Sequence, residues 1–200
     1  MSILIEDKTQ GKKREILSAS KEVFRQFGLS KVTMDDIARA SKMGRSTLYY
    51  YYKNKMEVFL DLISEEFMDV IIPATDKVRP ANSLKENLVI YTSTKLERLQ
   101  LKEKQYYHLI QDLRDNRDIF FQIHNISTEK EFQIYNQIIL WGIENGDVPE
   151  MTDSDREFLV KTIVTALSAL EKEFFLFDAI DDLNSRLDWL ANLLVKGLQY

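Results

Sequence analysis

The chain has 200 residues, of which 44% are hydrophobic, enough for one mid-sized domain or a small domain fused to a larger one. It contains no cysteine, which excludes a disulfide framework and cysteine-based zinc sites. No stretch approaches the ~18 apolar residues that span a bilayer, and the N-terminal apolar run is too short for a signal peptide. These features predict a cytoplasmic protein that has no membrane segment.

Charge is unevenly distributed along the chain. The net charge is −5, but residues 1–55 carry 12 Lys and Arg against 6 Asp and Glu, a balance of +6. The remaining residues carry 15 basic and 26 acidic side chains, a balance of −11. A basic head on an acidic body is expected where one end of a protein meets phosphates, although chance clustering on a solvated surface gives the same pattern.

Apolar residues at helical spacing predict the first elements in chain order. The first helix has an inward face that includes Ile16 and Phe24, and it stops at Gly28. Thr33 is a suitable N-cap for the second helix, and Asn54 for the fourth. The predicted segments are 12–27, 34–41, 45–51 and a long fourth helix that follows residue 54.

The rest of the chain also favours helices. It has no strand-like alternation and no internal repeat, and the whole sequence has only 6 Gly and 3 Pro. Pro73 and Pro80 bracket a break after the fourth helix, and Ser83 and either Thr152 or Asp153 cap later helices. The prediction is an all-α fold of about nine helices. The later segments are a helix that Ser83 opens, 103–114, about 117–145, 153–177 and about 181–198.

Residues 33–55 are the most informative stretch. Two short helices joined by a turn of three or four residues form a helix-turn-helix, which needs a small residue where the helices cross. Ala38 supplies that residue, while Ile37, Met43 and Leu48 face inward. The outer face of the second helix then enters a major groove. The side chains that reach DNA from it are Arg45, Ser46, Thr47, Tyr50 and Tyr51.

Four consecutive tyrosines, residues 49–52, point in different directions from a helix, so they cannot all be core. We expect Tyr49 and Tyr52 to be buried, and Tyr50 and Tyr51 to face outward. Plain packing is the alternative explanation for these rings. For Arg45, contact with a phosphate competes with base reading as its role.

The joint order and spacing of several short motifs resembles the DNA-binding domain of the TetR family over about residues 10–59. These motifs are Arg14-x-Ile16-Leu17-x-Ala19, Phe24-x-x-Phe27-Gly28, Val32-Thr33, Ile37-Ala38 and Thr47-Leu48-Tyr49-x-Tyr51-Tyr52-Lys53-Asn54-Lys55. The chain departs from the family's pattern at Lys42 and Ser46, where glycine is usual. Because a left-handed backbone strains a residue with a side chain, we expect Gly44 to provide the flexible point of the turn.

The resemblance implies a role for each matching position. Thr33 caps the second helix and touches phosphate, Thr47 bonds phosphate or base, and Tyr49 packs near the backbone. Tyr51 meets phosphate, and Lys55 anchors a phosphate at the start of the fourth helix. Base reading falls to the variable positions. The full predicted DNA-binding set is Thr33, Arg45, Ser46, Thr47, Tyr49, Tyr50, Tyr51, Lys53 and Lys55.

The last two predicted helices have more apolar surface than one subunit core needs, including leucines at coiled-coil-like spacing. A four-helix interface, two helices from each subunit, would cover the surplus. Packing on the helix around 117–145 of the same subunit is the alternative. A dimer would place two recognition helices ~34–36 Å apart on a palindromic site. The predicted interface residues are Leu159, Ile163, Leu170, Leu187, Leu190 and Leu194.

The middle of the chain is rich in aromatic residues, and the resemblance implies a small-molecule pocket there that takes a hydrophobic inducer. An ordinary aromatic core is the alternative. The two histidines lack metal-ligand spacing, so we predict neither a metal site nor a cofactor. The predicted pocket residues are Tyr106, His108, Phe120, His124, Phe132 and Trp141.

The sequence has no glycine-rich phosphate loop, nucleophile elbow or metal motif, so it does not predict an enzyme. The resemblance implies a basic DNA-binding domain over 1–55 and an acidic regulatory and dimerisation domain over 56–200. Its partners would be double-stranded DNA, a second copy and a small-molecule effector, which releases a repressor from a palindromic operator by shifting the fourth helix. An activator with the same fold is one alternative. A helical scaffold without DNA binding is another, disfavoured by the basic head and the lack of repeats.

Overall fold

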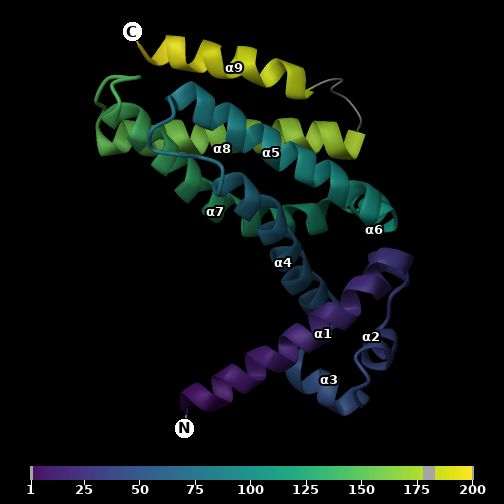
Figure 1. Cartoon of the computed structure of the whole chain (residues 1–200). Helices are drawn as coiled ribbons and strands as arrows, with labels where there is room; N and C mark the ends of the chain where they lie inside the picture. The colour runs from purple at the N-terminus through teal and green to yellow at the C-terminus, as the bar shows by residue number, and fades with distance from the viewer. Residues whose placement is uncertain (1, 178–182, 200) are drawn as a thin grey trace. The chain divides into compact units, whose positions relative to one another are not determined.

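The computed structural model describes residues 2–177 and 183–199, apart from the side chains at 2–8, 117, 120, 121, 124–127, 172, 174–177 and 183–185 (Figure 1). Its regular elements within that part are nine helices, which confirms the all-α prediction. They are α1 Ser2–Lys31, α2 Met34–Ala40, α3 Arg45–Tyr51, α4 Lys55–Thr75, α5 Leu84–Gln105, α6 Tyr107–Asp115, α7 Arg117–Glu144, α8 Asp153–Phe177 and α9 Leu183–Leu198.

The chain divides into two compact units that do not follow a single cut in the sequence. The first contains the chain up to Glu66 together with Lys102–Ile123, and the second contains Phe67–Leu101 together with the chain from His124 onward. Helix α4 therefore contributes residues to both units. The domain boundary expected after residue 55 falls at the first turn of this helix.

Apolar side chains from α1 to α4 form the core of the first unit. Ile16 and Phe24 of α1, Ile37 of α2, Leu48 of α3 and Phe59 of α4 are all fully buried. The centroids of the Phe24 and Phe59 rings are 5.7 Å apart, which packs α1 against α4. Burying each such side chain contributes about 1.5–3 kcal/mol, and this core fixes the two short helices α2 and α3.

Short polar residues begin several helices where the sequence predicts them. The Thr33 hydroxyl accepts a hydrogen bond from the Asp36 backbone N–H, and the Asp36 carboxylate accepts one from the Thr33 backbone N–H. Ser83 and Glu86 form the same reciprocal pair at the start of α5. Thr152 accepts a bond from a backbone N–H in the first turn of α8. Each cap stabilises its helix by about 0.5–2 kcal/mol.

Two predicted helix boundaries were wrong. Helix α1 begins at Ser2 rather than near Lys12, about ten residues before the predicted start. Helix α4 continues through Pro73 to Thr75. Pro73 has no N–H to donate, so one helical hydrogen bond is missing there. The pattern continues after it, because the Asp76 N–H donates to the Ile72 carbonyl at 2.9 Å.

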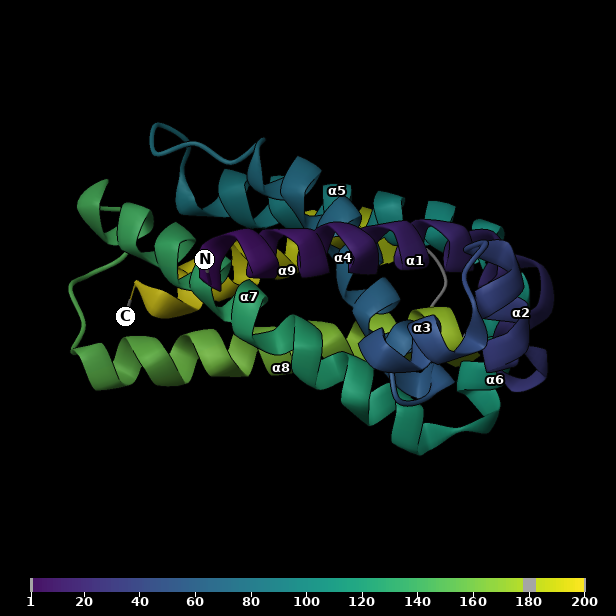
Figure 2. The ribbon, with the colours of Figure 1, turned by 90° about the horizontal axis from the view of Figure 1, so that it is seen from below.

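The second unit is built around α5, α7 and α8. Its core contains Tyr91, Tyr135, Ile138 and Val160, all fully buried. Gly142 of α7 allows close contact with α5, because a Cβ at this position would lie 2.9 Å from the Cβ of Leu84. Helices α5 and α8 run in roughly the same direction, and α9 runs back in the opposite direction in both views of the ribbon (Figures 1 and 2). Of the helices described, none has the length and apolar content to cross a bilayer.

Candidate nucleic-acid interface

Helices α2 and α3 form the predicted helix-turn-helix. Ile37 and Leu48 are fully buried between them, and Ala38 is 6% exposed. The Met43 N–H donates to the Ala38 carbonyl at 2.9 Å, which closes the turn. Residues 45–51 form α3 as predicted, so its outer side chains occupy a short, rigid element.

The turn takes its left-handed residue at Lys42, with φ 54°. Gly44 has an extended backbone, with φ −66° and ψ 146°, and it is the N-cap of α3. The expectation that Gly44 provides the flexible point was therefore wrong. A left-handed conformation costs a residue with a side chain about 1–2 kcal/mol, and the turn bears that cost at Lys42.

The tyrosines at 49–52 divide differently from the prediction. Tyr52 is buried and its hydroxyl lies 3.0 Å from a carboxylate oxygen of Asp61, and Tyr50 is 76% exposed, both as expected. Tyr51 is half-buried. Tyr49 is 40% exposed, so its predicted burial was wrong. Leu48 fills the inward face of this short helix, and the C-cap Tyr52 packs beyond its end. Tyr49 lies about 100° away from Leu48 around the helix axis.

The other predicted DNA contacts on α3 and after it are open to solvent. Arg45, Ser46, Thr47 and Lys53 are all exposed. Arg45, Ser46, Thr47 and Tyr50 give α3 an outward surface of one guanidinium, two small hydroxyls and a phenol, and Lys53 adds an ammonium after the helix. These groups donate hydrogen bonds to phosphate oxygens and to base edges, which is the chemistry that a major-groove helix needs.

Thr33 and Lys55 lie at helix starts but already have partners inside the protein. The Thr33 hydroxyl bonds the Asp36 carboxylate at 2.6 Å, and these bonds lower the pKa of Asp36. The Lys55 ammonium donates to the carbonyls of Leu29 at 2.7 Å, Val32 at 2.8 Å and Ser30 at 3.2 Å. Contact between Lys55 and a phosphate therefore requires the exchange of at least one of these bonds.

The predicted pocket residues are divided between the two units. Tyr106 is buried and His108 is exposed, and both belong to the first unit. Phe132 and Trp141 belong to the second unit, where they are half-buried against its core. The side chains of Phe120 and His124 lie outside the described residues. No cluster of three or more His, Asp or Glu suited to a metal occurs in the described part of the chain.

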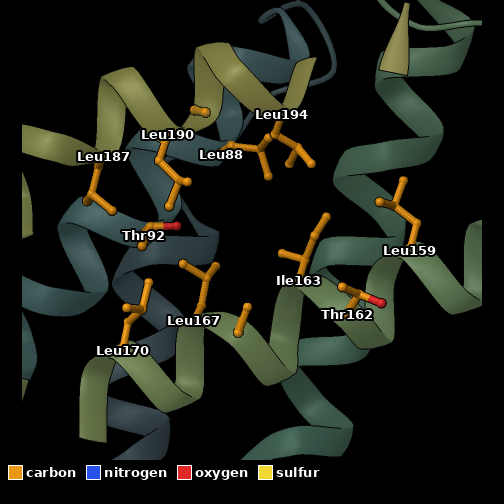
Figure 3. Close-up of a pocket in the computed structure, with 12 residues that line it drawn as sticks. Leu88, Thr92, Leu159, Thr162, Ile163, Leu167, Leu170, Leu187, Leu190 and Leu194 are labelled. Atoms are coloured by element: carbon orange, nitrogen blue, oxygen red, sulfur yellow. The ribbon is translucent and has the colours of Figure 1, made fainter. Parts of the chain in front are cut away.

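The six predicted interface residues, five leucines and one isoleucine, line one apolar cavity of about 230 Å³ inside the second unit (Figure 3). Side chains of α8 and α9 point toward one another across it, and α5 contributes Leu88 and Thr92 (Figure 3). Ile163 and Leu187 are buried within the subunit. The predicted residues in this lining are Leu159, Ile163, Leu170, Leu187, Leu190 and Leu194.

The sequence predicts surplus apolar surface on the last two helices of the second unit, but sequence reasoning missed a buried ion pair. Phe158 of α8 and Trp189 and Leu193 of α9 are more than half exposed, which marks an apolar outer surface. A buried ion pair joins Lys95 of α5 to Glu131 of α7, and both side chains are almost inaccessible. The signal for the pair was present, because Lys95 lies four residues after Tyr91 on the inward face of α5, where an apolar residue is usual.

Comparison with known proteins agrees with this geometry. Residues 16–62 match the family model described as bacterial regulatory proteins, tetR family. The HTH-type transcriptional regulator YhgD of Bacillus subtilis is 31% identical over 77 residues, 38% of this chain, so the match spans only 40% of that relative. The fatty acid metabolism regulator protein of Bacillus subtilis is 23% identical over 186 residues, 92% of this chain and 94% of the relative.

Solved structures share the fold along nearly the whole chain. The fatty acid degradation regulator FadR of Bacillus halodurans has a TM-score of 0.66 at 19% identity, covering 94% of this chain and 97% of its own. FadR of Bacillus subtilis in complex with stearoyl-CoA has a TM-score of 0.62 at 20% identity, covering 92% and 98%. The helix-turn-helix and the match over residues 16–62 are those of a DNA-binding transcriptional regulator rather than an enzyme. This DNA-binding region is of the TetR type.

Proposed function

We propose that this protein is a sequence-specific repressor that binds a palindromic operator as a dimer and leaves it when a small, largely hydrophobic ligand binds. The outward face of α3 carries the proposal, because Arg45, Thr47 and Tyr50 are exposed there on a helix that a buried core fixes. In this scheme residues 1–55 bind DNA and residues 56–200 regulate and dimerise, acting in the cytoplasm. Ligand binding acts through α4, which contributes to both units.

Selection of the full chain on random duplex DNA at two salt concentrations tests DNA recognition. We expect a palindrome to be enriched, with half-sites about one helical turn apart, and affinity to fall steeply as salt rises. The absence of any enriched sequence, with no binding at low salt, would contradict the proposal. In that case a helical scaffold without DNA binding would become the function to test.

The apolar cavity favours a ligand with an aliphatic chain. Its lining has ten aliphatic side chains, and its only polar side chains are the threonines 92 and 162, so the described lining offers no charge to a ligand. An aliphatic ligand also agrees with the similar proteins: one is a fatty acid metabolism regulator, and another was solved in complex with stearoyl-CoA. We propose that a fatty acyl chain occupies this cavity and that its binding weakens the hold on DNA.

Calorimetry with stearoyl-CoA tests the acyl-chain site. Ala191→Leu fills part of the cavity from α9 and should weaken binding on the order of tenfold or more, since a well-packed site rejects added methylenes. Ala169→Leu is the matched control, because Ala169 is exposed on α8 and does not line the cavity. Equal affinity in Ala191→Leu and the wild type would place the acyl chain elsewhere.

A further inference from the structure

Arg45, the first residue of α3, is held by a residue of α2. Its Nε lies 3.4 Å from one carboxylate oxygen of Asp35, and its Nη1 lies 3.5 Å from the other. The guanidinium carbon lies 5.7 Å from the centroid of the Tyr49 ring, one turn further along α3. Asp35 and Tyr49 thus contact the same guanidinium from two different helices.

These contacts orient the side chain without locking it. Ordinary hydrogen bonds from nitrogen to oxygen measure 2.7–3.2 Å, so both distances to Asp35 are longer than usual. The side chains of Arg45 and Asp35 are 67% and 54% exposed, and exposed ion pairs add little to stability. The arrangement therefore costs little to rearrange, and its main effect is to restrict where the guanidinium can go.

Asp35 leaves part of the guanidinium available. A guanidinium has five N–H donors, and contacts at Nε and Nη1 engage two of them. The remaining three are enough for the two-bond contact with O6 and N7 of guanine, which is the commonest specific contact in the major groove. The Asp35 carboxylate also repels phosphate, which disfavours the competing contact between this arginine and the DNA backbone.

A helix-stabilising role does not explain the contact. Asp35 and Asp36 both lie in the first turn of α2, where the helix dipole favours acids. Asp36 performs the capping, through its bonds with Thr33. The Asp35 carboxylate is directed instead to Arg45, on the helix that faces DNA.

We propose that Asp35 is a positioning residue that, together with Tyr49, holds Arg45 for reading guanine, and that it sets base specificity rather than affinity. This inference rests on the proposed DNA-binding function. The proposal gives α2 a role in base recognition, although α3 is the helix expected to enter the major groove. Loss of the carboxylate frees Arg45 to alternate between base and phosphate, so binding continues while discrimination falls.

The experiment compares the base preferences of full-length wild type and Asp35→Asn by selection on random duplexes. We expect the wild type to prefer G·C at one position of each half-site. In Asp35→Asn that preference should fall on the order of tenfold, while preferences at the other positions persist. Arg45→Lys should lose preference at the same position, because a lysine lacks the planar pair of donors.

Glu15→Gln is the control for charge, because it removes an exposed acid of α1 that pairs with Lys12 rather than with Arg45. It should change affinity uniformly without altering any single position. An unchanged preference in Asp35→Asn, or a uniform shift like that of Glu15→Gln, would overturn the inference while leaving the proposed function intact. A wild type that enriches no sequence would overturn both. Thermal melting of each variant confirms that a lost preference is not lost folding.

Discussion

The last turn of α1, which leads into α2, shows how individual residues hold the DNA-binding unit together. Gly28 breaks the regular helix with φ 74° and ψ 179°. The backbone N–H of Ser30 donates to the Asp112 carboxylate of α6 at 3.0 Å, and the Ser30 hydroxyl bonds the same group. Lys55 satisfies carbonyls of this segment. The carboxylate of Asp112 thus accepts from the donors of Ser30, and the ammonium of Lys55 donates to the free carbonyls of the same segment.

Gly28→Ala should destabilise the protein strongly. A Cβ at this position would lie 2.5 Å from a carboxylate oxygen of Asp112, and positive φ strains alanine in addition. We expect the free energy of unfolding in urea to fall by about 2–4 kcal/mol, because strain combines with weakened bonds to Ser30. Gly197→Ala is the control, since nothing lies within 4 Å there and alanine favours the helix. Equal effects of the two changes would contradict this account.

Lys42→Gly should stabilise the helix-turn-helix. Glycine adopts the left-handed conformation of residue 42 without strain, although it gains more freedom in the unfolded chain. The net gain should be about 0.5–1 kcal/mol, read from the shift of the urea midpoint. Ser46→Gly, in the regular backbone of α3, should instead lower stability by about 0.5–1 kcal/mol. A loss of stability in Lys42→Gly would show that the lysine side chain contributes a contact that outweighs the strain.

Residue types at helix ends made the DNA-binding region predictable. Thr33 and Asn54 mark helix starts, and Leu48 marks the inward face of α3. The residues on the opposite, exposed face of α3 could therefore be predicted. The environment of Arg45 was not predictable, because Asp35 lies ten residues earlier and meets it only after the turn folds. Tyr49 was misplaced because four adjacent tyrosines give no amphipathic pattern from which to choose.

Helices α5, α7 and α8 meet at a buried group of charges. Lys95 of α5 contacts Glu131 of α7, and its ammonium lies 2.7 Å from Glu171 of α8. Burial lowers the pKa of Lys95, but the two carboxylates raise it by more, so the lysine stays charged. Burial raises the pKa of Glu171 to about 7, against the effect of Lys95 and with the help of Glu131. The single positive charge of Lys95 is thus shared between the carboxylates of Glu131 and Glu171.

Stability should fall as pH rises from about 4.5 to about 7. In that window folded Glu171 keeps a proton that the unfolded chain has released, so the unfolded state binds fewer protons. The loss should be on the order of 2–3 kcal/mol, measured by urea unfolding across pH. Glu171→Gln should flatten this dependence and match or exceed the wild type at pH 8. Glu173→Gln, exposed on the same helix, should keep the wild-type profile. An unchanged slope in Glu171→Gln would exclude Glu171 as its source.

Helix existence was predictable from apolar spacing, but the partner of each apolar stripe was not. Leu187, Leu190 and Leu194 repeat as in a coiled coil, and such a repeat shows that a face is covered without saying by which chain. In the structure these side chains meet α8 and α5 of their own subunit around the cavity. The helix start at Ser2 was missed because the first residues show no periodic apolar pattern in the sequence.

At the scale of the whole molecule, the proposed function depends on pairing two subunits. We propose that the dimer surface includes the exposed Phe158, Trp189 and Leu193 of α8 and α9, because the predicted residues Ile163 and Leu187 are buried within their own subunit. Trp189 and Leu193 are four residues apart and so share a face of α9. Exposed aromatic and aliphatic side chains gathered on two neighbouring helices are typical of a self-complementary interface.

Leu193→Glu should convert the dimer to monomers by placing a charge in an apolar interface. We expect sedimentation to show a halved mass, and operator binding to weaken by at least tenfold, because each half-site then binds alone. Leu101→Glu is the control, since Leu101 is similarly exposed but lies on α5. A dimer that persists in Leu193→Glu would place the interface on another surface.

The exposed indole of Trp189 has a practical consequence. The chain has two tryptophans, and Trp141 is half-buried against the core of its unit while Trp189 is 64% exposed. An indole in water emits at longer wavelength than one surrounded by apolar groups. If subunits pair over Trp189, dilution will shift the emission to the red. The difference between wild type and Trp189→Phe isolates that signal, so the protein carries its own optical reporter of assembly.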